Sequence, residues 1–276
     1  MTNYGKQKDK SALFFREKRC YNGYAVLPQE REGFMMAKAM IHAHRGASGY
    51  APENTLAAFR KAILLGSDGI ECDIHLSGDG VYMVCHDDTA DRTSNGSGKL
   101  SDYTVEELKK LDFGSKYSAD FAGEPIPTLH EMLCVVHDMD PINIEIKCLG
   151  NNTDEEIDAF YQFLVDERVL ERVLISCFNG DLLVRMKELH PDLRCGWLCY
   201  GEDVKRSIDL AVAGKLDAIH PDFYHVDEAY IREAHANGIQ INVWTVNDPK
   251  DIQAMLDLEC DGIITNYPDR ARALIG

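Results

Sequence analysis

The sequence predicts an α/β chain folded as a TIM-type (βα)8 barrel with a small insertion after the third strand. Short apolar segments alternate with helical patterns from Ile41 onward, which is typical of parallel βα architecture. Eight such segments occur between Ile41 and Val246, the number that closes a barrel of this type. The chain has 276 residues, 45% of them hydrophobic, so it can bury a core of the size that a barrel of about 250 residues needs.

Each expected strand is a short run of apolar or β-branched residues bounded by polar or turn residues. The eight ranges are 41–44, 69–73, 81–86, 142–147, 173–178, 194–199, 218–221 and 240–246. Helices are expected at 54–65, 129–138, 154–167, 180–189, 203–212, 227–236 and 249–258. The run 262–265 is a further strand-like segment, whose pairing the sequence does not decide.

The connection between the second and third expected strands is unusually short. Only HLSGDG separates them, which is too short for a crossover helix. SGDG is good turn chemistry, so a local hairpin is one interpretation, and a barrel that lacks one helix is the other. We expect Glu71 and His86 to come together in either geometry.

On two of the expected strands, two charged residues are separated by one residue. Glu71 and Asp73 are separated by one residue, so they point to the same strand face, about 6.6 Å apart along the chain. Carboxylate oxygens are preferred ligands of Mg²⁺ and Ca²⁺, whereas zinc more often recruits histidine and cysteine. Glu145 and Lys147 share a face in the same way. Glu145 could complete a carboxylate triad while Lys147 approaches a phosphate, and an internal ion pair is the competing interpretation.

His44, Arg45 and His86 add basic groups to these carboxylates. Histidine can act as acid or base near neutral pH, and the planar fork of arginine matches a phosphate or a carboxylate. Any one of these residues alone would more often be an ordinary ion pair or a core histidine. Together they form a polar cluster that a hydrophobic interior would not otherwise tolerate. The cluster therefore predicts a bound ion or an anionic ligand.

Several longer motifs surround these residues and follow one another in a fixed order. They are HRGASGYAPENT at 44–55, ECD at 71–73, HDDTADRTSNGSG at 86–98, IPTLHE at 126–131, IEIK at 144–147 and VWTVND at 243–248. With this ordered set the chain resembles the glycerophosphodiester phosphodiesterase family from about Ile41 to Arg270. A lone HRG would mean little, but the whole set is a specific signal.

The resemblance implies metal-dependent hydrolysis of a small-molecule glycerophosphodiester to an alcohol and sn-glycerol 3-phosphate. Two routes of attack on the phosphorus stay open: a neighbouring glycerol hydroxyl could attack first and form a cyclic phosphate, or water could attack directly. Lysophospholipase D activity on long-chain lipids and a noncatalytic phosphate-binding barrel are the alternatives. The resemblance also implies a role for each site residue. Glu71, Asp73 and Glu145 would bind one divalent cation, Mg²⁺ or Ca²⁺, and His44 and His86 would act as acid and base. Arg45 and Lys147 would contact the phosphate, and Trp244 would form a wall of the pocket.

Residues 89–127 interrupt the barrel pattern with glycine, serine, aspartate and aromatic residues. This interval resembles the small insertion of the family, and it could cap the active site or be an exposed structural insertion. Two positions depart from the family pattern. His42 stands where an apolar residue is usual, and we expect it to have a structural role deeper in the barrel. Asn266 stands where an acidic residue is common, which leaves fine specificity open.

Charge and composition limit the classes of partner that the chain is expected to bind. A net charge of −17 and a pI near 4.9 argue against binding to nucleic acid or to anionic membranes. No apolar run approaches the roughly 18 residues of a membrane span and the N-terminus lacks a secretory apolar region, so the predicted address is the cytoplasm. The nine cysteines show no zinc-type spacing and are expected to be reduced thiols. The extension 1–38 could pair as strands, cap the closed end of the barrel, or contribute to a subunit contact in a homo-oligomer.

Overall fold

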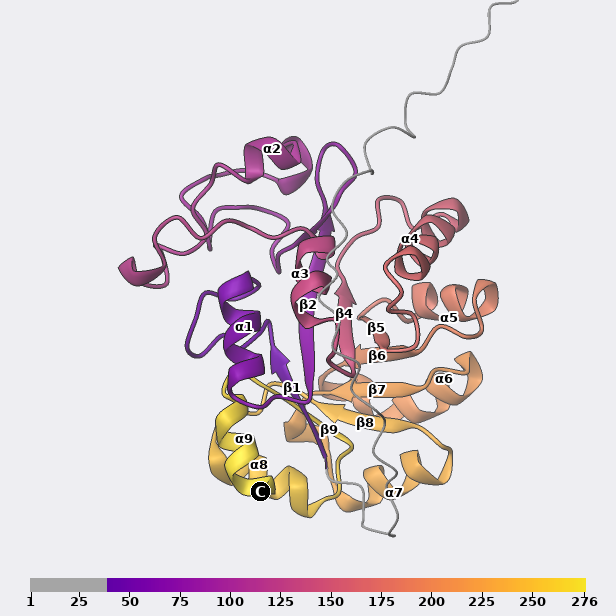
Figure 1. The fold of residues 1–276 in the computed structure, drawn as a ribbon. Helices are drawn as coiled ribbons and strands as arrows, with labels where there is room; N and C mark the ends of the chain where they lie inside the picture. Colours follow the sequence, from indigo (N-terminus) through magenta and orange to yellow (C-terminus); the bar gives the residue numbers. More distant parts are fainter. Residues whose placement is uncertain (1–38) are drawn as a thin grey trace, which may run out of the picture. The chain divides into compact units, whose positions relative to one another are not determined.

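The computed structural model describes residues 39–276. Eight parallel strands pair in the order β1-β9-β8-β7-β6-β5-β4-β2, and pairing of β1 with β2 closes them into a barrel. The helices lie around the outside of these strands (Figure 1). The predicted fold class is therefore confirmed. The predicted extension, 1–38, lies outside the described residues.

The barrel strands are short and almost entirely buried, as expected for strands covered on both faces. They are β1 (Met40–His44), β2 (Gly69–Leu76), β4 (Ile142–Ile146), β5 (Val173–Cys177), β6 (Cys195–Cys199), β7 (Ala218–Pro221), β8 (Gln240–Val243) and β9 (Gly262–Thr265). Their outward side chains pack against the helices in one continuous apolar core.

The helices that follow these strands are α1 (Leu56–Leu64), α3 (Leu129–Val136), α4 (Asp154–Asp166), α5 (Gly180–Leu189), α6 (Ser207–Gly214), α7 (Glu228–Ala236), α8 (Pro249–Asp257) and α9 (Pro268–Ile275). All but α6 and α9 begin at a polar residue whose side chain accepts from a backbone N–H of the first turn. At α3 and α4 a threonine and the glutamate three residues later form a reciprocal capping box. The helix expected at 203–212 instead begins as a 3-10 turn at Gly201–Arg206, and α9 was not predicted.

One strand assignment was wrong. The segment expected at 81–86 contributes β3 (Tyr82–Val84), which pairs antiparallel with β2 and is not a barrel strand. The short connection forms a hairpin turn, because Gly80 adopts φ +78° and the Ser77 side chain accepts from the backbone N–H of Val81 at 3.0 Å. The barrel is instead completed by β9, which pairs with β1 and β8.

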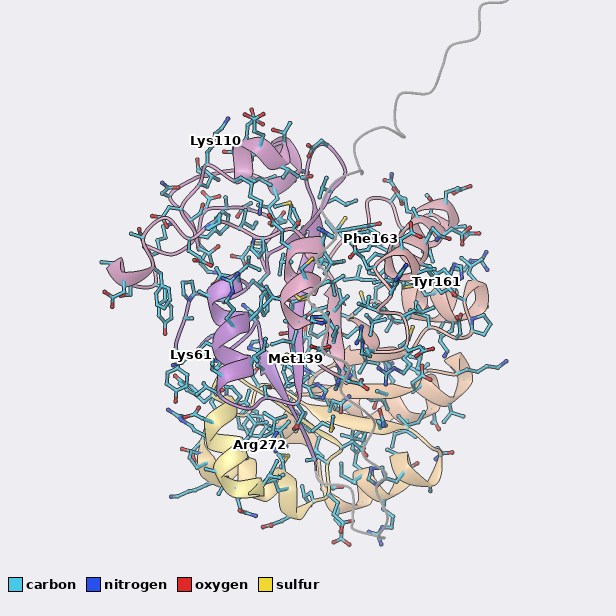
Figure 2. All side chains as sticks on the ribbon, in the orientation of Figure 1. Lys61, Lys110, Met139, Tyr161, Phe163 and Arg272 are labelled. Carbon is cyan, nitrogen blue, oxygen red and sulfur yellow. The ribbon has the colours of Figure 1, made fainter. Side chains whose placement is uncertain are left out.

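The insertion, 89–127, follows this hairpin and packs on it. Its apolar side chains, Leu100, Leu108, Phe113 and Ile126 among them, form a second small core with residues of β3. Helix α2 (Val105–Leu108) lies beyond the upper end of β2 in Figure 1, and Lys110, labelled in Figure 2, marks the outer surface of the insertion. A capping role over the active site stays a prediction.

Two further expectations concern the described part of the chain. Within residues 39–276 no helix combines the length and apolar character needed to cross a membrane. Six of the eight cysteines in this range are buried, a position that suits the expected core thiols.

Candidate active site

The predicted site residues gather toward the carboxyl ends of the barrel strands. A pocket of about 120 Å³ is lined by seven of the eight: His44, Arg45, Glu71, His86, Glu145, Lys147 and Trp244. The eighth, Asp73, is buried beside the pocket, with Oδ2 at 3.4 Å from Nε of Arg45 and Oδ1 at 3.1 Å from Nζ of Lys147. The structure therefore brings the whole predicted set together.

Glu71, Asp73 and Glu145 form an acidic cluster. One carboxylate oxygen from each lies within 4.8 Å of the others, and all three side chains are buried. Strand geometry produces this arrangement, because alternate residues of β2 share a face and the parallel register sets Asp73 beside Glu145 of β4. Three hard oxygen donors at this spacing fit a divalent cation.

The pKa shifts of the three carboxylates also fit a bound cation. Burial raises the pKa of Glu71 well above its usual value, and the charges of Asp73 and Glu145 add to the shift. Burial, followed by repulsion from Asp73, raises the pKa of Glu145 to about 7. Burial would also raise the pKa of Asp73, but Arg45 and Lys147 outweigh it and hold that pKa well below its usual range. The cluster thus retains negative charge that a cation would offset.

Arg45 turns the chain at the end of β1. It adopts φ +55° and Gly46 follows at φ +77°, where a Cβ would lie 2.7 Å from the backbone of Ala58. This turn aims the backbone N–H of Arg45 at Oε2 of Glu71, 2.8 Å away. The glycine of the HRG motif is therefore required by the close approach of helix α1.

The two histidines have different partners. His44 Nδ1 lies 2.6 Å from Oδ1 of Asn266, and its Nε2 is 3.9 Å from Oε2 of Glu71. Since an amide oxygen only accepts, the His44 proton is on Nδ1 and the lone pair is on Nε2. Burial, with a smaller effect of the Arg45 charge, lowers the pKa of His44 to about 4, so the ring is neutral at pH 7. His86 instead has Nδ1 at 2.7 Å from the carboxylate of Asp87.

An ion-pair chain formed by Asp87, Arg92, Glu53 and Arg45 links His86 to the turn at the end of β1. Arg92 donates to Asp87 at 2.7 and 3.0 Å and to Glu53 at 2.7 and 2.8 Å, and Arg45 donates to Glu53 at 2.8 Å. Hydrogen bonds from Arg92 lower the pKa of Asp87 to about 2. Sequence reasoning missed Glu53, Asp87 and Arg92, although the PENT and HDDTADR motifs contain them.

The pocket also has neutral lining residues. Trp244 donates from Nε1 to the His220 carbonyl at 2.6 Å, and its ring meets Phe178 edge-on with centroids 5.7 Å apart. Asn143 and Ser176 also line the pocket. Sequence reasoning missed both, because a single polar residue in a strand carries no signal of its surroundings. His42 is buried and does not line this pocket.

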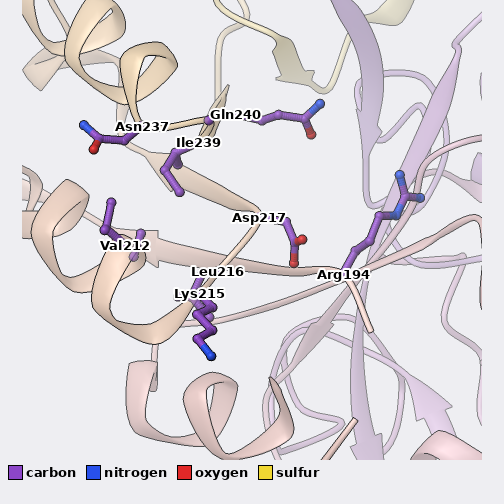
Figure 3. A pocket seen from close by; sticks show the side chains of 10 residues that line it. Arg194, Val212, Lys215, Leu216, Asp217, Asn237, Ile239 and Gln240 are labelled. Carbon is purple, nitrogen blue, oxygen red and sulfur yellow. The ribbon is translucent and has the colours of Figure 1, made fainter. Parts of the chain in front are cut away.

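A larger pocket, of about 420 Å³, lies at the amino ends of β7 and β8 and is lined by Arg194, Asp217 and Gln240, among others (Figure 3). The described residues that line it include no histidine. Its one carboxylate, Asp217, already accepts from Lys187 at 3.0 Å and from the backbone N–H of Cys195 at 2.8 Å. The smaller pocket is therefore the candidate active site.

Comparison with known proteins gives consistent results. Residues 44–270 match the Glycerophosphoryl diester phosphodiesterase family. The chain is 40% identical over 237 residues to a glycerophosphodiester phosphodiesterase of Caldanaerobacter subterraneus subsp. tengcongensis, an alignment that covers 84% of this chain and 96% of that protein. It is 32% identical over 243 residues to a glycerophosphodiester phosphodiesterase of Bacillus subtilis, with coverages of 82% and 83%.

Solved structures show the same likeness. A phosphodiesterase of Oleispira antarctica, determined in complex with the product sn-glycerol-3-phosphate, aligns with a TM-score of 0.77 and 31% identity, covering 86% of this chain and 97% of that one. A glycerophosphodiester phosphodiesterase of Thermotoga maritima aligns with a TM-score of 0.71 and 30% identity, with coverages of 86% and 98%.

Proposed function

The chain belongs to the glycerophosphoryl diester phosphodiesterase family, and on that premise we propose that it hydrolyses glycerophosphodiesters to an alcohol and sn-glycerol 3-phosphate. The observation that carries the proposal is the convergence of three carboxylates, two histidines and two cationic side chains on one pocket. The product complex of the Oleispira antarctica relative supports the choice of substrate class.

Glu71, Asp73 and Glu145 would hold one divalent cation, Mg²⁺ or Ca²⁺. Both ions prefer carboxylate oxygens, and the raised pKa of Glu145 supports the assignment because a cation would offset the burial and the repulsion that raise it. When bound, such a cation supplies charge neutralisation at the phosphate and lowers the pKa of a coordinated hydroxyl.

Arg45 and Lys147 would bind the phosphate. Both flank Asp73, so their charged ends already lie beside the acidic cluster. Burial would lower the pKa of Lys147, but Asp73 and Glu145 outweigh it and raise that pKa, so the ammonium group stays charged. The planar fork of Arg45 can contact two phosphate oxygens at once.

The different partners of the two histidines support a different proposed role for each. His44 is neutral with its lone pair on Nε2, which suits a base that takes the proton of the attacking hydroxyl. His86 has the Asp87 carboxylate at Nδ1, which can share the positive charge of a protonated ring, and this suits the acid that protonates the leaving alkoxide. If a cyclic phosphate forms first, the two histidines exchange roles when water opens it.

Long-chain lysophospholipids are the second candidate substrates. The observation in their favour is a group of exposed aromatic residues that follow the barrel strands: Phe178 is 42%, Tyr200 62% and Tyr224 81% exposed. Exposed apolar surface of this kind can contact lipid chains.

The decisive experiment measures release of sn-glycerol 3-phosphate from glycerophosphocholine, glycerophosphoethanolamine and lysophosphatidylcholine side by side, with and without added Mg²⁺ or Ca²⁺. We expect metal-dependent release that is faster from the first two substrates. His44→Ala should lower the rate of release by about 10²- to 10⁴-fold, and His235→Ala, which removes an exposed histidine paired with Asp261, should remain fully active. Metal-independent release would contradict the proposal, and a preference for lysophosphatidylcholine would favour the lipid substrate.

A further inference from the structure

The floor of the active-site pocket carries buried polar atoms without partners. Both Oδ1 and Nδ2 of Asn143, and Oγ of Ser176, make no hydrogen bond, although the two residues are only 1% and 0% exposed. Both residues line the pocket. Buried polar groups are nearly always paired in folded proteins, so unpaired ones that face a pocket point to a ligand that supplies the missing partners.

Strand register fixes where these atoms lie. Asn143 on β4 is paired with Glu71 on β2, and Ser176 on β5 is paired with Glu145 on β4. The two neutral side chains therefore border the acidic cluster, and the pocket is charged at one end and neutral but polar on its floor.

The chemistry of this floor matches hydroxyl groups. An amide side chain offers two donors and an acceptor oxygen, and a serine hydroxyl both donates and accepts. Hydroxyl groups of a ligand do the same. Leu198, Trp244 and Ile264 supply apolar surface to the same pocket, which suits the C–H groups of a polyol. A volume of about 120 Å³ has room for several waters or one small polyol.

We propose that Asn143 and Ser176 form the glycerol subsite and donate to and accept from the hydroxyls of the glycerol half of the substrate. This inference rests on the proposed function and deepens it. The glycerol half enters the pocket, where Arg45 and Lys147 meet its phosphate, and the alcohol half stays at the mouth. The enzyme therefore selects its substrates chiefly by the glycerol moiety.

Product binding tests this without turnover. Calorimetry in saturating Mg²⁺ would compare sn-glycerol 3-phosphate, 1-propyl phosphate, which lacks both hydroxyls, and inorganic phosphate. We expect the preference of the unmodified protein for glycerol 3-phosphate over propyl phosphate to fall about 10-fold in Asn143→Leu and in Ser176→Ala, since each removes a hydrogen bond to a hydroxyl. Affinity for inorganic phosphate should not change.

Ser207→Ala is the matched control, because Ser207 is buried outside the pocket and bonds to the Val204 carbonyl and Tyr230. Its preference should equal that of the unmodified protein. An unchanged preference in folded Asn143→Leu and Ser176→Ala, verified by thermal melts, would overturn the subsite. So would a loss of Mg²⁺ affinity with no change in preference, which would assign these residues to orienting the cation.

Different results would reject the glycerol subsite and the proposed hydrolysis. If the unmodified protein releases glycerol 3-phosphate from glycerophosphocholine but the variants keep its preference, the hydrolase stands and the subsite is rejected. If no diester is cleaved, yet selective binding of glycerol 3-phosphate is lost in the variants, the subsite stands and hydrolysis is rejected. Should Asn143→Leu fail to fold, the smaller change Ser176→Ala decides the question.

Discussion

The acidic cluster and the ion-pair chain lie at the same pocket but hold their charges in opposite ways. In the acidic cluster three carboxylates crowd together below the surface, and burial raises the pKa of Glu71 and Glu145. In the ion-pair chain acidic and basic groups alternate, and Arg92 lowers the pKa of Asp87. The first arrangement carries charge that needs a further partner, and the second is complete within the protein.

This difference suggests that the acidic cluster binds a ligand, whereas the ion-pair chain positions catalytic side chains. Like charges held close together in a buried place are unfavourable unless a cation joins them, which supports the acidic cluster as the proposed cation site. Alternating pairs with forked arginine contacts fix geometry instead. Arg92 comes from the insertion, so the chain ties that segment to both His86 and Arg45.

The largest expected effect comes from the histidines, one beside each region. His44→Ala and His86→Ala should lower turnover by about 10²- to 10⁴-fold, because each removes a positioned acid or base. Affinity for Mg²⁺ and for glycerol 3-phosphate should change much less. Turnover measured at saturating metal tests this, and a variant with nearly normal turnover would remove its histidine from the assigned role.

A smaller loss is expected when the ion-pair chain is cut. Arg92→Met should lower kcat by about 10²-fold, since a displacement of His86 or Arg45 by about 1 Å has consequences of that size. Mg²⁺ affinity should remain unchanged. Because Arg92 is partly exposed, the free energy of unfolding should fall by less than about 1 kcal/mol. Arg92→Lys keeps the charge but not the fork, and recovery of full activity in that variant would argue against geometric positioning.

The two regions should also respond to pH in opposite directions, with smaller effects on stability. The pKa of Glu145 is raised to about 7, so its contribution to the stability of the metal-free protein is full below its ordinary pKa of 4.5 and is lost as pH rises through about 7. The pKa of Asp87 is lowered to about 2, so its contribution is present above 3.8 and is lost as pH falls through about 2.

Thermal melts of the metal-free protein at pH 5 and pH 8, repeated with Glu145→Gln, measure the first of these effects. We expect the unmodified protein to be less stable at the higher pH, and we expect a smaller difference in Glu145→Gln. Added Mg²⁺ should restore stability at pH 8, because a bound cation favours the ionised carboxylate. An identical pH response in the two proteins would contradict the raised pKa.

Part of the acidic cluster follows from local geometry, and the family resemblance joins Glu145 to Glu71 and Asp73. Alternate residues of a strand share a face, so the spacing alone places Glu71 with Asp73, and Glu145 with Lys147. The ion-pair chain could not be placed in this way. It joins Glu53 to Arg92 across two loops, and no periodicity relates those positions.

Strand pairing shows the same limit. The segments 81–86 and 262–265 are both short apolar runs, yet one ends in a hairpin and the other closes the barrel. Their local patterns are alike, and only hydrogen bonds to distant strands distinguish them. Asn143 and Ser176 were not predicted as site residues for a related reason. The composition of a strand does not reveal whether a polar side chain in it has a hydrogen-bond partner.

We propose that the acidic cluster binds a divalent cation and that the ion-pair chain does not. Calorimetric titration of Mg²⁺ and Ca²⁺ into the unmodified protein, Glu145→Gln and Arg92→Met at pH 8 distinguishes the two regions. We expect one cation to bind the unmodified protein and Arg92→Met with equal affinity, and we expect affinity at least about 10-fold weaker in Glu145→Gln, which loses a carboxylate ligand and its charge. Equal affinity in Glu145→Gln and the unmodified protein would contradict this proposal.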